Sequence, residues 1–327
     1  MSEQLLSNPL VSIVLPAYNR SDYIEQAIHS VIDQTYANWE LVIADNGSNL
    51  ETQKILEKYY ELERVTHYRN EVNIGLFPNL NKAIAACSGQ YVLLLCDDDF
   101  LLPECLETTV KNILKFPAAD LLLSPIKRVD SQNNHLPSQA VYKFSIFAPE
   151  TKLSYPENTL PLLLQHGSIN SNLTGMLFKR DLSQKVGFFR EDWKHAADWE
   201  WVYRVAKSCP ILLNSVSIAV IRGHSGQQSK ANFRDLSNSK EVAKMVKFLL
   251  SEPLVKVVKE SDQWASHIMQ HHLWYAFKAL SSGNWNSFLT LIQEVHTTTG
   301  FLDTFWSMLL FLPERWQMYS KKDFPRY

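Results

Sequence analysis

Short apolar runs alternate with amphipathic segments through the first 124 residues of the chain. Runs rich in Val, Ile and Leu between turn residues predict strands, and apolar residues recurring every three or four positions predict helices. The predicted strands cover residues 11–15, 39–44, 65–69, 91–95 and 120–124, and the predicted helices cover 22–34, 52–62, 78–86 and 103–116. This alternation predicts an α/β fold with a doubly wound, mostly parallel sheet flanked by helices.

The pattern changes after residue 124. It is irregular through about residue 174, then predicts a helix at 199–207, strands at 211–214 and 216–221, and helices from about 233 to the end. We therefore expect a domain over residues 1–232 and a C-terminal helical region over 233–327.

An unusually apolar run within the helical region covers residues 301–312. It is too short to span a bilayer, which needs about 20 residues. Three roles remain open for it: a cover for the first domain, a homodimer interface, or a peripheral contact with a membrane surface.

Composition narrows the class of protein. The 327 residues are 46% hydrophobic, and 32 basic residues against 34 acidic ones leave a formal charge of -2, which excludes broad electrostatic binding of nucleic acid. The four cysteines form no C-x-x-C pair, which favours free thiols in a reducing compartment. We expect a cytoplasmic protein, with peripheral contact at the inner face of the membrane as an alternative.

Three consecutive carboxylates, Asp97, Asp98 and Asp99, follow the buried run at 91–95. The carboxyl ends of parallel strands are where α/β folds place their binding sites. Adjacent carboxylates repel one another unless a cation lies among them, and their oxygens suit Mg²⁺ or Mn²⁺. The alternative is that they are solvated loop residues that cap the helix beginning near Pro103.

Several further motifs occur in register with the predicted strands. They are Pro16-Ala17-Tyr18-Asn19, Asp45-Asn46-Gly47-Ser48, Asn73-Ile74-Gly75, Asn81, Cys96-Asp97-Asp98-Asp99, Thr174-Gly175-Met176-Leu177-Phe178, Gly187-Phe188-Phe189, Ala197-Asp198-Trp199-Glu200 and Arg222-Gly223-His224. In identity, order and spacing they resemble the family 2 glycosyltransferases, which have the GT-A fold. The resemblance covers about residues 9 to 230.

The resemblance implies a nucleoside diphosphate sugar as donor, with a UDP-sugar preferred by family frequency. It implies that Asp99 ligates a divalent metal, Mn²⁺ or Mg²⁺, with Asp97 as a helper and His224 completing the metal shell. Asp98 would lie against the ribose or sugar of the donor. Such a metal neutralises the departing diphosphate without proton transfer.

The same resemblance assigns the rest of the nucleotide pocket. Asp45 matches the position that accepts a hydrogen bond from the base, and Pro16, Ala17 and Tyr18 match the wall around it. Arg222 falls where related enzymes contact the diphosphate. The alternative for Asp45 is a turn residue that bonds its own backbone.

By resemblance, Asp198 is the candidate general base that activates the acceptor hydroxyl in a single displacement. A helix N-cap is the alternative role for Asp198, and Glu200 or Asp192 are alternative bases. Three nearby tryptophans are candidates either to stack on a sugar ring or to pack in the core: Trp193, Trp199 and Trp201.

Three positions depart from the family pattern, since Cys96, Asn46 and Ala197 stand where acidic residues are often found. The expected function is nonetheless an inverting glycosyltransferase of cell-envelope polysaccharide biosynthesis, acting on a hydroxyl of a glycan or lipid-linked acceptor. One rival is a catalytically degenerate nucleotide- or glycan-binding protein with the same fold. A nucleotidyltransferase is the other, although residues 15–20 lack the glycine that its phosphate loop needs.

Overall fold

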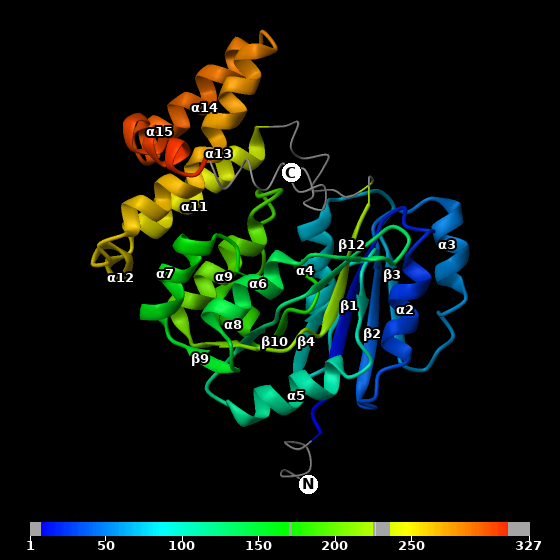
Figure 1. Ribbon diagram of the computed structural model, residues 1–327. Coiled ribbons are helices and arrows are strands. Elements are labelled where there is room, and N and C mark those ends of the chain that lie inside the picture. The colour runs from blue at the N-terminus through cyan, green and yellow to red at the C-terminus, as the bar shows by residue number, and fades with distance from the viewer. Residues whose placement is uncertain (1–7, 170–171, 225, 227–235, 313–327) are drawn as a thin grey trace. The chain divides into compact units, whose positions relative to one another are not determined.

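The chain folds into two compact units. The computed structural model describes residues 8–169, 172–224, 226 and 236–312. One unit comprises residues 1–155 and 170–224, and the other comprises 156–169 and 225–327. The expected boundary at residue 232 lies outside the described residues, and segment 156–169 groups with the C-terminal helices. Figure 1 labels the helices and strands of both units.

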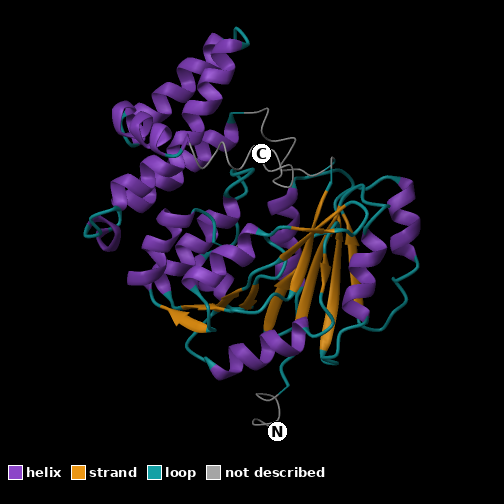
Figure 2. Ribbon diagram, viewed as in Figure 1, coloured by secondary structure: helices purple, strands orange, loops and turns teal. Residues whose placement is uncertain are grey.

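An eight-stranded sheet forms the centre of the first unit (Figure 2). Its strands in spatial order are β3 (Val65–Arg69), β2 (Trp39–Asp45), β1 (Val11–Ala17), β4 (Tyr91–Leu94), β10 (Leu177–Lys179), β6 (Leu121–Leu123), β11 (Ile211–Leu213) and β9 (Lys152–Ser154). The pairs among β3, β2, β1 and β4 are parallel, as is β6 with β11, whereas β10 runs antiparallel to both its neighbours and β9 antiparallel to β11. The expected mostly parallel α/β sheet is confirmed.

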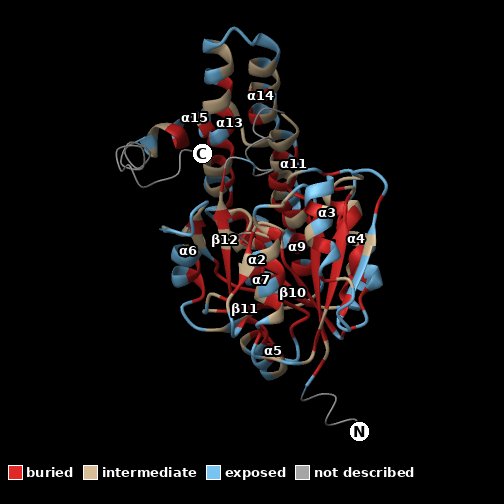
Figure 3. Ribbon diagram, turned by 90° about the vertical axis from the view of Figure 1, so that its right-hand side faces the viewer, coloured by how far each residue is buried: buried red, intermediate tan, exposed pale blue. Residues whose placement is uncertain are grey.

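Helices flank this sheet and complete its core. They are α2 (Ile24–Ile32), α3 (Leu50–Glu57), α4 (Leu76–Ala86), α5 (Cys105–Lys115), α6 (Gln139–Phe147), α8 (Leu182–Val186) and α9 (Ala197–Ser208). All seven residues of β1 are buried, as expected of a parallel strand covered on both faces. Figure 3 shows that buried residues gather in the strands of the first unit. The apolar stripe of α2 packs into the same core.

A second, four-stranded sheet lies beside the carboxyl end of β4. It consists of β5 (Phe100–Leu101), β12 (Ala219–Gly223), β7 (Lys127–Asp130) and β8 (His135–Leu136). The chain passes from β4 to β5 through the three aspartates. Because β12 pairs with β5, with Val220 opposite Phe100, the residues that end β12 arrive next to that turn.

The second unit is helical, as the sequence predicted. Its helices are α7 (Pro156–His166), α11 (Ser237–Ser251), α12 (Pro253–Lys256), α13 (Ser261–Ser281), α14 (Trp285–Thr298) and α15 (Phe301–Leu310). The long helix α13 packs against α14, α15, α11 and α7. Over the part of the chain that the structure describes, no helix combines the length and apolarity needed to cross a bilayer.

Candidate functional site

The three aspartates occupy a tight turn between the two sheets. The backbone N–H of Asp99 donates to the carbonyl of Cys96 at 3.2 Å, which closes the turn. The helix that follows, α5, begins at Cys105 without a side-chain cap. The alternative in which the triplet caps this helix is therefore wrong.

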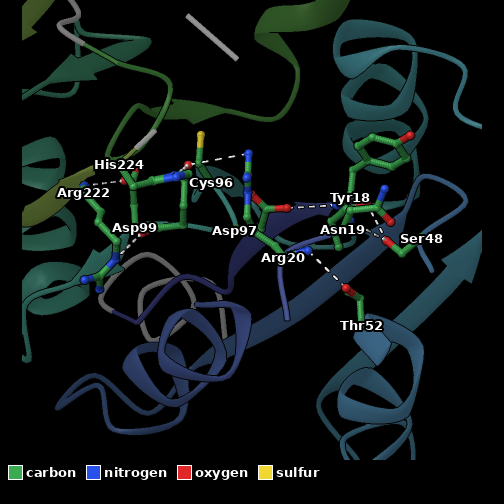
Figure 4. A network of polar contacts seen from close by, with 12 residues as sticks. Tyr18, Asn19, Arg20, Ser48, Thr52, Cys96, Asp97, Asp99, Arg222 and His224 are labelled. Atoms are coloured by element: carbon green, nitrogen blue, oxygen red, sulfur yellow. Dashed lines mark hydrogen bonds and ion pairs between the residues drawn. The ribbon is translucent and has the colours of Figure 1, made fainter. Parts of the chain in front are cut away.

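Asp97 joins the triplet to the segment after β1. Its carboxylate accepts a hydrogen bond from the backbone N–H of Tyr18 at 2.9 Å and another from Nε of Arg20 at 3.3 Å (Figure 4). The backbone N–H of Arg20 is in turn fixed by the Thr52 hydroxyl at 3.0 Å. Asp97 thus anchors the Pro16–Tyr18 segment next to the acidic turn.

Asp98 faces His224, which directly follows β12. Nε2 of His224 lies 2.8 Å from Oδ2 of Asp98. The guanidinium of Arg20 lies near the same oxygen, with Nη2 at 3.8 Å. The Asp98 and His224 side chains keep 13% and 7% of their accessible surface.

Asp99 points into the protein and is only 2% exposed. Its Oδ2 accepts hydrogen bonds from the Thr174 hydroxyl at 2.5 Å and from Nδ2 of Asn172 at 3.1 Å. Its Oδ1 accepts the backbone N–H of Arg222 at 3.0 Å (Figure 4). Both carboxylate oxygens of Asp99 are therefore engaged by the protein itself.

Burial and neighbouring negative charge raise the pKa values of Asp97 and Asp99. The pKa of the Asp97 carboxyl is raised to about 7, first by burial and then by the charge of Asp98. Burial and Asp98 also raise the pKa of Asp99 well above its usual value. Burial and the neighbouring carboxylates raise the pKa of the Cys96 thiol in the same way, so the thiol adds no charge. A nearby cation stabilises carboxylates crowded in this manner.

The side chain of Arg222 is buried, with 1% exposed. Its guanidinium donates to Oε1 of Gln26 at 2.7 Å, to Oδ1 of Asn133 at 2.6 Å and to the carbonyl of Asp98 at 3.1 Å. It also stacks over the ring of Tyr23 at 4.6 Å. These contacts tie β12 to the acidic turn.

Asp45, Ala17 and Arg69 lie in register at the carboxyl ends of adjacent parallel strands. Asp45 is buried, forms an ion pair with Arg69, and accepts the backbone N–H of Ser48 at 2.9 Å. The turn role considered for Asp45 is thus present. Tyr18, by contrast, is 40% exposed at this edge of the sheet.

Asn46 belongs to a network of side-chain amides beside this edge. Its Nδ2 donates to Oδ1 of Asn73 at 2.8 Å, while its Oδ1 accepts the backbone N–H of Ile74 at 3.0 Å. A carboxylate accepts but does not donate, so aspartate would lose half of these contacts. This explains why asparagine stands at a position that is often acidic in the family.

Replacing Gly47 by Ala should destabilise this turn strongly. Gly47 has φ +75°, and an added Cβ would lie 2.9 Å from the carbonyl carbon of Val72. Alanine is strained at this left-handed φ, and its Cβ would crowd the backbone of Val72. We therefore expect a loss of roughly 2 to 5 kcal/mol in the free energy of unfolding, measured by chemical denaturation. The matched control is Gly175→Ala, with φ +85° and only the Ile218 side chain at 3.4 Å, for which we expect about 1 to 2 kcal/mol. Equal losses would contradict the backbone clash at Gly47.

Asp198 is the second residue of α9 and is half-buried. Its Oδ1 accepts the backbone N–H of Trp199 at 2.8 Å, and the helix N-terminus favours a negative side chain there. Preceding it, Ala197 is fully buried, which disfavours the acidic residue often found at that position.

Both alternative bases are held in ion pairs. Glu200 is buried and paired with Arg204 at 2.9 Å, one turn along the same helix. Asp192 is exposed and paired with Arg190 at 2.7 Å. A carboxylate that is already paired with a guanidinium is less available to an acceptor hydroxyl, which argues against Glu200 and Asp192 as the base.

The start of α9 is fixed by the preceding loop. Asn81 on α4 donates to the carbonyl of Phe189 at 2.8 Å and accepts its backbone N–H at 3.1 Å. The indole N–H of Trp201 donates to the carbonyl of Gly187 at 2.9 Å.

All three candidate tryptophans are buried, which supports core packing over sugar stacking: Trp193, Trp199 and Trp201.

The sequence model of the family described as "Glycosyl transferase family 2" matches residues 12–187, which is more than half of the chain. This match spans the turn at Asp45, the acidic triplet and the Thr174 segment. The chain belongs to glycosyltransferase family 2. The expectation from the sequence motifs is confirmed, and the protein is a transferase.

Curated relatives carry the same assignment. An uncharacterized glycosyltransferase of Rickettsia prowazekii is 25% identical over 269 residues, covering 81% of this chain and 80% of the relative. The putative teichuronic acid biosynthesis glycosyltransferase TuaG of Bacillus subtilis is 42% identical over 92 residues, covering 28% of this chain and 36% of TuaG. The chain thus spans most of the first relative and about a third of the second.

Solved structures share the fold of this family 2 glycosyltransferase. TarS of S. aureus aligns with a TM-score of 0.64 at 20% identity, covering 87% of this chain and 49% of TarS. The mannosyltransferase PcManGT of Pyrobaculum calidifontis, solved with GDP-Man and Mn²⁺, aligns with a TM-score of 0.56 at 15% identity, covering 95% and 83%. A TarS fragment, residues 1–349, was solved with UDP-GlcNAc.

The acidic turn brings together side chains of types that divalent ions use as ligands, without forming a complete site within the part of the chain that the structure describes. In the described residues, no three side chains of His, Cys, Asp or Glu converge as a complete protein cage. However, the Asp98 carboxylate and the His224 imidazole already face each other, and both are accepted ligand types for Mn²⁺-like ions. Mg²⁺ sites of this kind use one or two carboxylates plus substrate phosphates.

Two arginines of this glycosyltransferase were not predicted as site residues. Arg20 contacts Asp97 and Asp98, and Arg69 pairs with Asp45. The sequence signal for Arg20 is its place directly after Pro16–Asn19, and for Arg69 its place at the carboxyl end of the third strand. Both positions lie at the edge where parallel strands place binding residues.

Proposed function

We propose that the protein is an inverting, metal-dependent glycosyltransferase that moves a sugar from a nucleoside diphosphate sugar to an acceptor hydroxyl. The observation that carries this proposal is the contact at the carboxyl end of β4, where Nε2 of His224 lies 2.8 Å from Oδ2 of Asp98. Neighbours solved with UDP-GlcNAc and with GDP-Man support a nucleotide-sugar donor.

In this proposal Asp98 and His224 hold the metal, with Asp97 beside them. Asp99 was the sequence-based choice of ligand, but its two oxygens already accept three hydrogen bonds inside the protein. We therefore assign Asp99 to positioning the turn and β12. When bound, the metal neutralises the charge of the diphosphate leaving group.

The proposed base pocket lies along the ends of β1, β2 and β3. Tyr18 offers an exposed aromatic face to the base, with Pro16 and Ala17 as the adjoining wall. We keep Asp45, which forms an ion pair with Arg69, as the acceptor for an N–H group of the nucleotide base. The guanidinium of Arg222 is buried and hydrogen-bonded within the protein. Arg222 therefore positions the acidic turn instead of contacting the diphosphate.

Asp198 takes the proton of the acceptor hydroxyl in a single displacement, which inverts the anomeric centre. The acceptor we propose is a growing glycan or lipid-linked glycan of cell-envelope polysaccharide biosynthesis. The names of two relatives, TuaG of teichuronic acid biosynthesis and the chondroitin synthase of Escherichia coli, support a polysaccharide product.

Calorimetric titration with UDP, dTDP, GDP and CMP, each with and without Mn²⁺, tests the donor site. We expect one diphosphate, UDP as first choice, to bind with an affinity that depends on Mn²⁺. That result also selects the donor sugars for a transfer assay. If none of the four binds, the donor site is degenerate and the rival of a glycan-binding protein with the same fold replaces the proposal. Nucleotide binding without transfer would favour the nucleotide-binding form of that rival.

The C-terminal helices carry an exposed apolar stripe. Leu302, Trp306 and Leu310 recur every four residues along α15, and all three are exposed. Peripheral membrane contact at the cytoplasmic face and homodimer formation stay predictions for this stripe. Sedimentation with anionic vesicles at low salt tests the first, and the sedimentation coefficient of the protein alone tests the second.

A further inference from the structure

An open pocket of about 470 Å³ lies on the first unit, between the four-stranded sheet and α6. It is lined by residues of β7, β8 and α6 and does not include the residues of the proposed donor site. Its lining comprises Lys127, Arg128, His135, Leu136, Ser138, Val141, Tyr142 and Ser145.

The charged side chains that line this pocket are cationic. They belong to Lys127 and Arg128, His135 adds an imidazole, and no carboxylate belongs to the lining within the described residues. Asp130 on the same strand instead binds its own turn, accepting Nδ2 of Asn134 at 2.9 Å. Each basic group therefore favours a negatively charged occupant.

The N-terminus of helix α6 also favours a negatively charged occupant of the pocket. Its N-cap residue, Ser138, lines the pocket and accepts the backbone N–H of Val141 at 3.4 Å. The positive end of the helix macrodipole therefore lies at the pocket. Tyr142, on the first turn of α6, is 68% exposed and presents an aromatic face of the kind on which sugar rings stack.

The pocket adjoins the proposed transfer site through the pairing of β7 with β12. Arg128 is opposite Ile221 in this pairing, three residues before His224. At a strand rise of about 3.3 Å per residue, this places the backbone of Arg128 roughly 10 Å from that of His224. A Cβ built on Gly223 would lie 3.7 Å from Nη2 of Arg128, so the guanidinium reaches to the end of β12.

We propose that this pocket binds an anionic group of the acceptor, so that the acceptor is an acidic glycan carrying phosphate or carboxylate groups. The proposal rests on the proposed transferase function and adds the chemical class of the acceptor. Lys127, Arg128 and His135 bind the anionic group, and Tyr142 packs against a neighbouring sugar. The bound glycan then extends along β12 toward the catalytic turn.

Calorimetric titration of the full chain with three oligomers of equal numbers of units tests this inference. The probes are an oligogalacturonate, an oligomer of glycerol phosphate and a neutral maltooligosaccharide, each at low and high salt. We expect the acidic probes to bind and the neutral one to bind at least tenfold more weakly, with the difference shrinking at high salt. The acidic probe that binds more tightly identifies carboxylate or phosphate as the natural group.

The test variant is the double substitution Lys127→Gln with His135→Gln, because both side chains are exposed and their loss should not unfold the chain. We expect about tenfold weaker binding of the acidic probe. The control is Lys111→Gln on α5, an exposed lysine outside the pocket. Mn²⁺-dependent UDP binding should be unchanged in both variants.

Two results would overturn the inference: equal affinity of the wild type for acidic and neutral probes, or unchanged acidic-probe binding in the double variant. Failure of the proposed function is recognised separately, as an absence of nucleotide binding in the wild type. The two outcomes are thus distinguishable in the same set of titrations.

Discussion

Replacing Asp198 by Asn is expected to abolish sugar transfer while donor binding remains. The amide is nearly the same size as the carboxylate and can still accept the backbone N–H of Trp199, so the start of α9 should be preserved. It cannot accept a proton from the acceptor hydroxyl. Loss of a general base predicts a kcat lower by a factor of about 10² to 10⁴, measured in a transfer assay, with an unchanged Kd for the nucleotide.

Asp192→Asn is the matched control for this variant. It makes the same chemical change in the same acidic stretch, at an exposed carboxylate paired with Arg190. We expect near wild-type kcat for Asp192→Asn. Full activity in Asp198→Asn, or a comparable loss in Asp192→Asn, would remove Asp198 from the role of base.

The parallel half of the fold follows from local sequence patterns. Strand β1 is a continuous apolar run because both faces are covered, and α2 shows its buried stripe as a 3.6-residue period. The predicted strand at 65–69 matches β3, and the other early strands differ by one or two residues at their ends. The segment from 124 to 174 was described only as irregular, because its strands have two to four residues and carry little periodicity.

The sequence predicts where the acidic turn lies, but not which partners its side chains contact. Three adjacent aspartates look alike in sequence, and which oxygen faces the donor depends on the turn and on β12, which arrives much later in the chain. The contact between Asp98 and His224 joins residues 126 positions apart. The ion pairs of Arg20 and Arg69 likewise depend on strand register, which no local pattern specifies.

Substituting Asp98 by Asn, or His224 by Gln, is expected to remove the dependence of donor binding on Mn²⁺. Nε2 of His224 lies 2.8 Å from Oδ2 of Asp98, and each change replaces a proposed metal ligand with an amide. Changes to residues that hydrogen-bond to metal ligands already lower metal affinity by about 10- to 100-fold, so losing a ligand should lower Mn²⁺ affinity by roughly 100-fold or more. Titration of Mn²⁺ at fixed UDP measures the effect.

Asp99→Asn tests whether the metal is held by Asp98 and His224, as proposed here, or by Asp99, as the sequence motif indicated. Asp99 accepts three hydrogen bonds from Thr174, Asn172 and the backbone of Arg222, so an amide there would direct its NH₂ group at a donor. A buried donor facing a donor lowers stability, and we expect a fall of about 1 to 3 kcal/mol in the free energy of unfolding. The folded fraction of Asp99→Asn should still bind UDP in a Mn²⁺-dependent way. If that variant folds normally and loses the Mn²⁺ effect while Asp98→Asn keeps it, the metal is held by Asp99 and the positioning role belongs to Asp98.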